Sequence, residues 1–332
     1  MKRSNPFKYV LSLCLAAMCW TTMTAAGNAL RGDVTNDGNV DITDVTSLID
    51  YLSGVRAIDL NLEAADVDDD GLVGISDVTA LVDYLLIGEW PYVPEPLVFT
   101  VGNVTFKMMP VKGGTFMMGA RDNDPYVRPW ESPAHEVTLS DYYIGETEVT
   151  QALWRAVMSS NPSWFSSANG YANNLQRPVE KITYANCVSF ITKLNQKTGK
   201  TFRLVTEAEW EFAARGGNRS RGYMYSGSDD LEEVGWHKGN SDDITHPVAS
   251  KAPNELGIYD MSGNVEEWCS DWYGLYTYKP ATNPTGPSSG DARIVRGGCW
   301  DQAFRMSRVT ARHEGFPTSP NVHTGLRIAM TW

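Results

Sequence analysis

The chain has few of the residues on which metal and redox chemistry usually depends. It contains 5 cysteines and 5 histidines in 332 residues, and no two histidines show the His-x-x-x-His spacing of a helical metal site. Positive charge is also scarce, since 28 Lys and Arg stand against 40 Asp and Glu, a formal net charge of −12. Phosphate binding needs clustered Lys and Arg, so this balance argues against nucleic acid as a partner.

Long apolar runs are missing as well. The apolar stretch 9–20 is too short to cross a bilayer as a permanent helix. It follows a basic N-terminus and precedes small residues, an order typical of an export signal. We assign the signal to residues 1–29, with cleavage near Ala26 or Ala29. The mature protein is therefore expected in the extracellular space, in the periplasm or at the cell surface, without a transmembrane anchor.

Removal of this signal leaves only three cysteines. They are Cys187, Cys269 and Cys299. Because three is an odd number, at most one internal disulfide can form, and one thiol stays free or pairs elsewhere. The sequence does not decide between these disulfide states.

The acidic charge is concentrated in a segment that contains an internal repeat. Residues 33–44 recur as residues 66–77, and each copy has the spacing of a twelve-residue calcium loop with glycine at its sharp turn. A solvated acidic face is the alternative, but a repeated loop in register with a repeated helix argues against it. The expected ligands are Asp33, Thr35, Asp37, Asn39, Asp41 and Asp44 in the first loop and Asp66, Asp68, Asp70, Leu72 and Asp77 in the second, with Asn39 and Leu72 binding through backbone carbonyls.

Each loop runs into a stretch with apolar residues at helical spacing, namely Val45, Leu48, Ile49 and Leu52, then Val78, Leu81, Val82 and Leu85. A calcium loop followed by a helix, given twice, resembles a dockerin module. The resemblance implies two calcium ions, folding that depends on them, and a cohesin-like protein partner. Dockerins contact cohesins around loop positions 10 and 11, which are Ile42-Thr43 and Ile75-Ser76 here, so the usual first polar residue is apolar. We assign the module to residues 30–90 and a proline-rich linker to residues 91–98.

Residues 99–332 have the pattern of one α+β domain. Strands are expected within 106–119, joined at Gly113-Gly114, and at 135–139, 293–296 and 325–331. Helices are expected at 151–158, from residue 184 to 195, and from residue 207 to Gly216, each after a threonine that can cap it. Strands at both ends of the domain suggest a sheet that brings its termini together.

The stretch 256–272 is unusually dense in turn residues, carboxylates and tryptophans. Asp260 and Glu267 bracket a turn at Gly263. A backbone bent by this glycine can aim carbonyl oxygens at the point where the two carboxylates converge, which suits a hard cation such as Ca²⁺. A tight loop with a solvated acidic rim fits the same residues.

Seven short motifs follow one another in order, at 114–119, 146–154, 177–179, 203–217, 259–268, 296–298 and 325–327. Together they resemble the formylglycine-generating enzyme family, also called sulfatase-modifying factors. The resemblance implies a heavily elaborated variant of the C-type lectin fold. It also implies a calcium site in the 256–272 stretch, with Asp260 and Glu267 as side-chain ligands and Gly263 and Val265 as carbonyl ligands.

The same resemblance puts the family's oxidase activity in question. In the oxidase two cysteines follow the Arg-Gly-Gly turn, and the corresponding positions are Gln302 and Ser307 here. Thiolates suit Cu(I), whereas amide and hydroxyl oxygens replace them poorly. We therefore expect no copper and no catalytic residue of the family's kind, with Cys299 as the one candidate nucleophile.

Two classes of function stay open. The first is an exported, calcium-binding module without oxidase activity that binds a glycan or protein ligand within polysaccharide-related assemblies. The second is an enzyme, either a formylglycine-generating oxidase with an altered site, for instance one that pairs Cys269 with Cys299, or another enzyme of a polysaccharide-degrading complex. Ordinary alternation of surface and core residues would also explain the proposed ligand residues. These are Trp300, Asp301, Gln302, Arg305 and Arg308, beside Phe304, Arg312 and His313.

Overall fold

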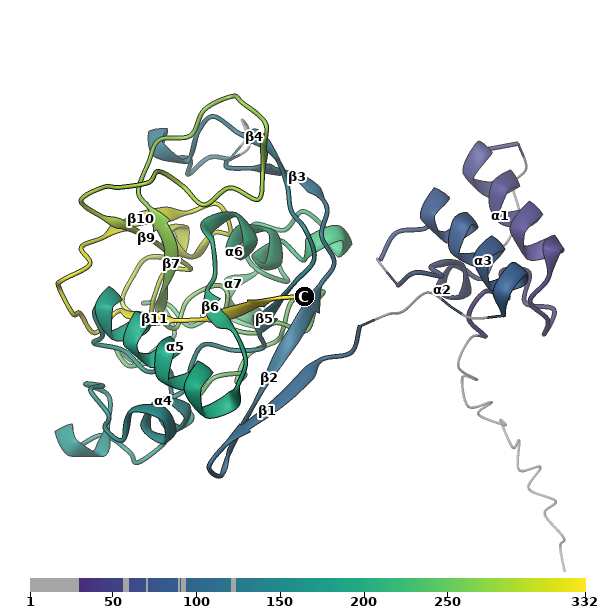
Figure 1. The fold of residues 1–332 in the computed structure, drawn as a ribbon. Coiled ribbons are helices and arrows are strands. Elements are labelled where there is room, and N and C mark those ends of the chain that lie inside the picture. The colour runs from purple at the N-terminus through teal and green to yellow at the C-terminus, as the bar shows by residue number, and fades with distance from the viewer. Residues whose placement is uncertain (1–29, 56–59, 70, 89, 91–93, 121–123) are drawn as a thin grey trace, which may run out of the picture. The chain divides into compact units, whose positions relative to one another are not determined.

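The structure is a computed structural model that describes residues 30–55, 60–69, 71–88, 90, 94–120 and 124–332. The described chain forms two compact units, a smaller one from residues 30–67 and 73–90 and a larger one from residue 94 onward (Figure 1). The expected export signal, the expected ligand Asp70 and linker positions 91–93 lie outside the described residues. Within the described part, no helix is both long and apolar enough to cross a membrane.

The smaller unit consists of three helices, α1 (Ile42–Ser53), α2 (Leu62–Ala65) and α3 (Ile75–Ile87). The helix α1 begins after Asp41, whose carboxylate accepts the Thr43 N–H at 2.7 Å, and ends at a left-handed glycine, Gly54.

The helices α1 and α3 contact each other and bury Val45, Leu48, Val78 and Leu81, as the apolar spacing predicts. The prediction was wrong for Ile49, Leu52 and Leu85, which are exposed. A unit of this size has too little interior to cover a wide apolar stripe on both helices.

The central sheet of the larger unit has five strands in the order β1-β2-β5-β12-β6. It joins the first and last strands of the unit, as expected for a sheet that brings the termini together. The strands are β1 (Leu97–Val101), β2 (Val104–Val111), β5 (Tyr142–Gly145), β12 (Ile328–Thr331) and β6 (Phe202–Leu204). The first two residues of β1, Leu97 and Val98, are the last two of the segment 91–98 that was assigned to the linker.

The expected hairpin at Gly113-Gly114 was wrong. The strand β2 pairs with β1 and β5, whereas β3 (Thr115–Met118) pairs with β4 (His135–Thr138) in a separate sheet that ends in β8 (Ala281–Thr282). A Cβ atom at Gly113 would clash with the backbone oxygen of Leu139. The glycine therefore permits a close approach of two chain segments instead of a tight turn.

A four-stranded sheet holds the residues of most functional interest. Its order is β10 (Arg312–Gly315), β9 (Arg293–Arg296), β7 (Glu266–Trp272) and β11 (Thr324–Leu326). The end of the 256–272 stretch is thus a strand, β7, which turn chemistry alone did not indicate. The expected final strand is two strands, β11 and β12, which lie in different sheets on either side of Arg327.

Helices α4 (Gln151–Met158), α5 (Tyr184–Thr198), α6 (Glu207–Ala214) and α7 (Leu231–Val234) complete the unit, with 3₁₀ turns η1 (Pro129–Glu131), η2 (Ser167–Asn169), η3 (Gly217–Arg219) and η4 (Phe304–Ser307). The three predicted threonine caps are confirmed, because Thr150, Thr183 and Thr206 each accept a backbone N–H of the first turn. The strand β5 divides the core, since Tyr143 packs with α4 and α5 while Tyr142 and Ile144 pack with α6.

A buried acid in β7 predicts how stability changes with pH. Burial, with the charge of Glu207 second, raises the pKa of Asp271 from 3.8 to about 7. The folded state therefore holds the proton more tightly, so the stability that this group contributes is present at low pH and is lost as the pH rises to about 7. In the unaltered chain we expect the free energy of unfolding to fall by about 2–3 kcal/mol between about pH 5 and pH 8 because of this group. Asp271→Asn should remove this fall, as measured by urea unfolding at each pH.

The matched control is Glu314→Gln, which changes an exposed acid of the same sheet, on strand β10. It should keep the pH dependence of the unaltered chain. An equal pH-dependent loss in Asp271→Asn and the unaltered chain would show that Asp271 is not the group responsible.

Candidate functional site: calcium loops and the residues around Gln302

The two loops of the smaller unit repeat the same backbone bends. Asn36 and Gly38 in the first loop have φ angles of 58° and 89°, and Asp69 and Gly71 at the same positions of the second have 53° and 87°. These left-handed conformations recur at loop positions 4 and 6, where a calcium loop turns sharply. The repeat seen in the sequence is therefore also a repeat of conformation.

The last aspartate of each loop is buried and bonded to the loop backbone. Asp44 accepts the N–H groups of Thr35 at 3.0 Å and Asp41 at 2.9 Å. Asp77 accepts those of Val67 at 2.6 Å and Gly74 at 2.7 Å. Both carboxylates thus hold the loop closed while remaining available as acidic ligands.

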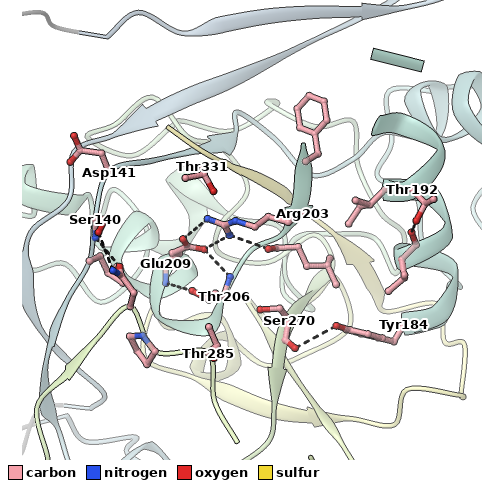
Figure 2. Close-up of a pocket in the computed structure, with 17 residues that line it drawn as sticks. Ser140, Asp141, Tyr184, Thr192, Arg203, Thr206, Glu209, Ser270, Thr285 and Thr331 are labelled. Carbon is pink, nitrogen blue, oxygen red and sulfur yellow. Dashed lines mark hydrogen bonds and ion pairs between the residues drawn. The ribbon is translucent and has the colours of Figure 1, made fainter. Parts of the chain in front are cut away.

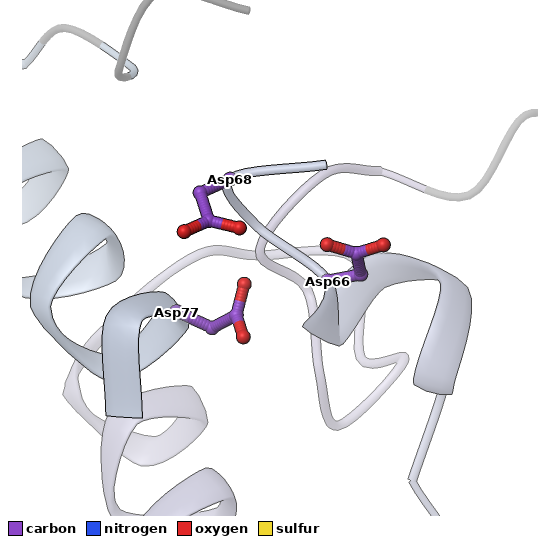
Figure 3. Close-up of side chains that lie close together, drawn as sticks. All are labelled: Asp66, Asp68 and Asp77. Atoms are coloured by element: carbon purple, nitrogen blue, oxygen red, sulfur yellow. The ribbon is translucent and has the colours of Figure 1, made fainter. Parts of the chain in front are cut away.

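The second loop gathers three acidic groups at one point. Carboxylate oxygens of Asp66, Asp68 and Asp77 lie within 4.8 Å of one another, with the side chains converging on a shared space (Figure 3). Among the described residues this is the one acidic group of that kind. The first loop has Thr35 where the second has Asp68, and the Thr35 hydroxyl bonds to Asp44 at 3.0 Å, which explains why it collects fewer carboxylates.

The remaining loop residues nominated by the sequence have mixed roles. Asp33 accepts the N–H groups of Asp37 and Gly38, each at 2.9 Å. Asp37 accepts the N–H of Asn39 at 2.8 Å, and Asp41 caps α1. Leu72 lies in the second loop with an exposed side chain, so any contribution comes from its backbone.

The 256–272 stretch of the larger unit buries both of its nominated carboxylates. Asp260 accepts the Ala249 N–H at 2.7 Å through Oδ2, and its buried Oδ1 has no partner. Glu267 bonds the Arg327 guanidinium, with Nη2 to Oε1 at 2.7 Å, and accepts the Trp210 indole N–H at 2.7 Å. The solvated acidic rim is thus not what forms here.

Glycine is required at position 263 in this turn. Gly263 has a φ of 93°, and a Cβ atom there would clash with the backbone oxygen of Trp236. A third buried acid, Glu148, accepts the Val265 N–H at 3.1 Å. Sequence reasoning missed Glu148, because it lies in a distant motif and no local spacing connects it to this turn.

Two of these acids, Asp260 and Glu148, have a raised pKa. Burial raises the pKa of Asp260 to about 6. Burial first, then the charges of Asp260 and Glu267, raise the pKa of Glu148 well above its usual value. The buried Asp260 Oδ1 has no hydrogen-bond partner and lies among carboxylates that disfavour each other's charge. A cation with oxygen ligands would satisfy both, so the residues present fit calcium.

The two positions that hold cysteine in the oxidase now hold an amide and a hydroxyl. Gln302 donates from Nε2 to Glu266 Oε1 at 3.0 Å, and its buried Oε1 has no hydrogen-bond partner. Ser307 is fully buried, and its Oγ also has none. Glu266 further bonds His313 Nδ1 at 2.9 Å. The result is a cluster rich in oxygen acceptors.

Cys299 is a buried thiol rather than an activated one. Its Sγ lies 3.1 Å from Asp301 Oδ1, whose other oxygen lies 2.9 Å from His323 Nε2. Burial, with the charges of Glu266 and Asp301 next, raises the pKa of the Cys299 thiol well above its usual value. Such a thiol stays protonated at neutral pH and is a poor nucleophile.

The described cysteines are all unpaired. Cys187, Cys269 and Cys299 form no disulfide. Cys269 packs with α6 and the central sheet, whereas Cys299 packs in a separate apolar cluster with Phe165 and Trp300. The structure therefore does not assemble the thiol pair that an altered oxidase would need.

The nominated ligand residues divide into internal and accessible ones. Trp300 is 9% exposed and donates its indole N–H to the Val322 carbonyl at 3.1 Å. Arg308 is buried and ion-paired with Glu131 at 2.8 Å, and Arg312 is buried against Glu207.

The accessible members lie beside these. Arg305 and Phe304 are exposed, and the Phe304 ring meets Tyr126 with centroids 5.3 Å apart. Asp301, Gln302 and His313 are partly exposed. A ligand could therefore reach these five side chains, whereas Trp300 and Arg308 support the surface from within.

A separate cavity of about 610 Å³ lies between α5, β6 and the segment around Asn283 (Figure 2). Its polar lining is largely internally bonded: Arg203 and Glu209 are held together by two hydrogen bonds of 2.6 and 2.7 Å, and the Tyr184 hydroxyl reaches the Ser270 carbonyl at 3.4 Å. None of the residues nominated from the sequence lines this cavity.

Comparison with protein families gives two matches. The model described as a sulfatase-modifying factor enzyme 1-like domain matches residues 98–332. The model of the dockerin type I domain matches residues 31–86. Together the two matches account for most of the described chain.

Individual relatives have names of different kinds. The formylglycine-generating enzyme of Streptomyces coelicolor is 30% identical over 65% of this chain and 87% of the enzyme. Chaperone protein LppX of Paenibacillus barcinonensis is 33% identical over 52% of this chain and 74% of that protein. Among solved structures, Treponema denticola variable protein 1 matches with a TM-score of 0.65 and 33% identity, over 72% of this chain and 100% of that one. Similarity of fold therefore does not by itself assign an activity.

Proposed function

Because the chain belongs to the sulfatase-modifying factor family and carries a dockerin type I domain, we propose that it is an exported binding module without oxidase activity. Both resemblances noted in the sequence are confirmed, and the larger unit has the family's variant of the C-type lectin fold. In this proposal the dockerin attaches the protein to an extracellular or cell-surface assembly involved with polysaccharides. The larger unit binds the ligand.

The dockerin domain binds calcium and implies a cohesin-type protein partner. Ile42 and Ile75, at loop position 10, are 63% and 75% exposed. Each is followed by a hydroxyl residue, Thr43 or Ser76. We propose that this pair of apolar side chains contacts the partner, because exposed isoleucines lose unfavourable contact with water on burial in an interface.

The observation that carries the loss of oxidase activity is the state of positions 302 and 307. An amide bonded to Glu266 and a buried hydroxyl replace the two thiols. Neutral oxygen ligands bind Cu(I) poorly, and the high pKa of the Cys299 thiol leaves no thiolate to take over. The enzymatic alternative is supported by similarity to formylglycine-generating enzymes, but not by the residues at these two positions.

The surface around Gln302 suggests the class of ligand. Asp301, which is partly exposed, and the more buried Glu266 are carboxylate acceptors, and the partly exposed Gln302 bonds Glu266. Such a surface favours a ligand that donates hydrogen bonds and disfavours sulfate or carboxylate groups. A neutral glycan, whose hydroxyls donate and whose ring can pack on Phe304, meets both conditions.

We expect the chain to bind neutral polysaccharides and Gln302→Ala to weaken that binding about tenfold, because the variant removes one polar contact of roughly 1.4 kcal/mol. Affinity electrophoresis against a panel of neutral and sulfated polysaccharides measures this. The control is Gln196→Ala, an exposed glutamine in α5, which should leave affinity unchanged. Binding that is lost in Arg305→Ala but retained in Gln302→Ala would indicate an anionic ligand and contradict the proposal.

We also propose one calcium ion in the larger unit, bound by Asp260 and Glu267 side chains and by the carbonyls of Gly263 and Val265. Its support is the orphaned Asp260 Oδ1 and the clustering of buried carboxylates. Calcium there would stabilise the turn before β7. It would thereby fix Glu266, the first residue of that strand and a member of the proposed ligand surface.

A further inference from the structure

Glu148 is a buried acid whose carboxylate hydrogen-bonds the turn that precedes β7. It lies between β5 and α4 and is 1% exposed. Its Oε1 accepts the Val265 N–H at 3.1 Å, and its Oε2 accepts the Asn264 side-chain amide at 2.8 Å. Glu148 therefore hydrogen-bonds two consecutive residues of the Gly263-Asn264-Val265 turn.

The same turn is fixed from its other side. Asn264 has a left-handed φ of 59°, and its Oδ1 accepts the His246 N–H at 2.9 Å. The Asn264 N–H donates to the Trp236 carbonyl at 2.8 Å. A residue in this strained conformation needs such contacts to hold it. Breaking the Glu148 bonds would release the peptide group between Asn264 and Val265, which adjoins the one that carries the Val265 carbonyl.

The charges around the turn do not balance. Glu148, Asp260 and Glu267 are buried carboxylates that act on one another electrostatically, and the guanidinium that acts on all three is that of Arg327. When all three are ionised, three negative charges face one positive charge, which leaves a deficit of two. A buried, uncompensated charge is costly, and Asp260 Oδ1 lacks even a hydrogen-bond donor. A single divalent cation would restore neutrality.

We propose that Glu148 is a positioning residue of a divalent-cation site in the larger unit. Its two hydrogen bonds fix the Asn264 side chain and the Asn264–Val265 peptide group, and thereby position Val265 so that its carbonyl can bind the ion. Glu148 also supplies the third negative charge that makes the site require a divalent ion. We do not assign it as a ligand, because the carboxylate oxygen of this cluster without a hydrogen bond is Asp260 Oδ1. This inference rests on the calcium site proposed above at Asp260, Gly263, Val265 and Glu267.

The experiment measures bound calcium and thermal stability of the full chain. Glu148→Gln keeps the size of the side chain and removes its charge. We expect it to weaken one calcium-binding event at least tenfold by isothermal titration, and to reduce the rise in melting temperature that calcium gives the larger unit. Glu267→Gln should remove the same binding event. Glu148→Asp, which keeps the charge on a shorter side chain, should retain more calcium affinity than Glu148→Gln.

The control is Glu146→Gln, which changes an acid two residues away that pairs with Lys107 at the surface, and should bind calcium like the unaltered chain. If Glu148→Gln lowers the melting temperature equally in calcium and in chelator, with calcium binding intact, Glu148 has a packing role only and the inference is wrong. If Glu267→Gln also leaves calcium binding intact, the proposed calcium site itself is absent. If Glu148→Gln does not fold, Glu148→Asp becomes the deciding variant. A calcium affinity of Glu148→Asp equal to that of the unaltered chain would contradict the positioning role.

Discussion

Chelation of calcium should unfold the smaller unit. Its core is a small cluster of valine, leucine and alanine side chains, too little to stabilise so short a unit by itself. Residues 30–90 also carry 14 acidic against 2 basic residues, and three carboxylates of the second loop lie within 4.8 Å of one another. Without a cation these groups repel one another, so folding and metal binding should be one event.

The measurement is the helical circular dichroism of residues 30–90 during titration from chelator into calcium. We expect a large gain in helix signal, two binding events, and loss of one event in Asp68→Ala. Asp83→Ala, which removes an exposed acid of α3, is the matched control and should retain both events. A fragment that is equally helical in chelator would show that calcium does not drive its folding.

Incubation with Cu(I), reductant, air and a peptide carrying a Cys-x-Pro-x-Arg motif should yield no formylglycine aldehyde. The copper route needs two thiolates at one metal ion, and the positions that should supply them are Gln302 and Ser307. The rest of the pocket is equally unsuited, since Gln302 is bonded to Glu266 and Cys299 is a protonated, buried thiol.

Mass spectrometry of the peptide provides the readout, with the Streptomyces coelicolor formylglycine-generating enzyme assayed in parallel as the positive control. The double change Gln302→Cys with Ser307→Cys should bind Cu(I) more tightly than the unaltered chain, because it restores two soft ligands. Turnover by the unaltered chain that disappears in Cys299→Ser would overturn the proposal and make Cys299 the centre of a different oxidase.

Several features followed from local sequence alone. The calcium loops are determined by twelve consecutive residues, so their spacing identified the bends at Gly38 and Gly71 that the structure contains. The helix starts after Thr150, Thr183 and Thr206 were also local, because a cap bonds within its own first turn. The family motifs identified the fold of the larger unit.

Other features depended on contacts between distant segments. The partners of β2 and β3, and the separation of β11 from β12 by Arg327, follow from sheet pairing that no local pattern encodes. Periodicity places a residue on a face of a helix or strand but does not say what covers that face. For this reason Trp300 and Arg308 looked like ligand residues in the sequence and are internal in the structure.

The candidate calcium site of the larger unit shows the same division. The sequence determined its nominated ligands, because Asp260, Gly263, Val265 and Glu267 lie in one short stretch. Tertiary structure added Arg327, which pairs with Glu267, and Glu148, which holds the turn. These residues reach the site from other parts of the chain, and the balance of charge in a buried site depends on every group that folding brings there.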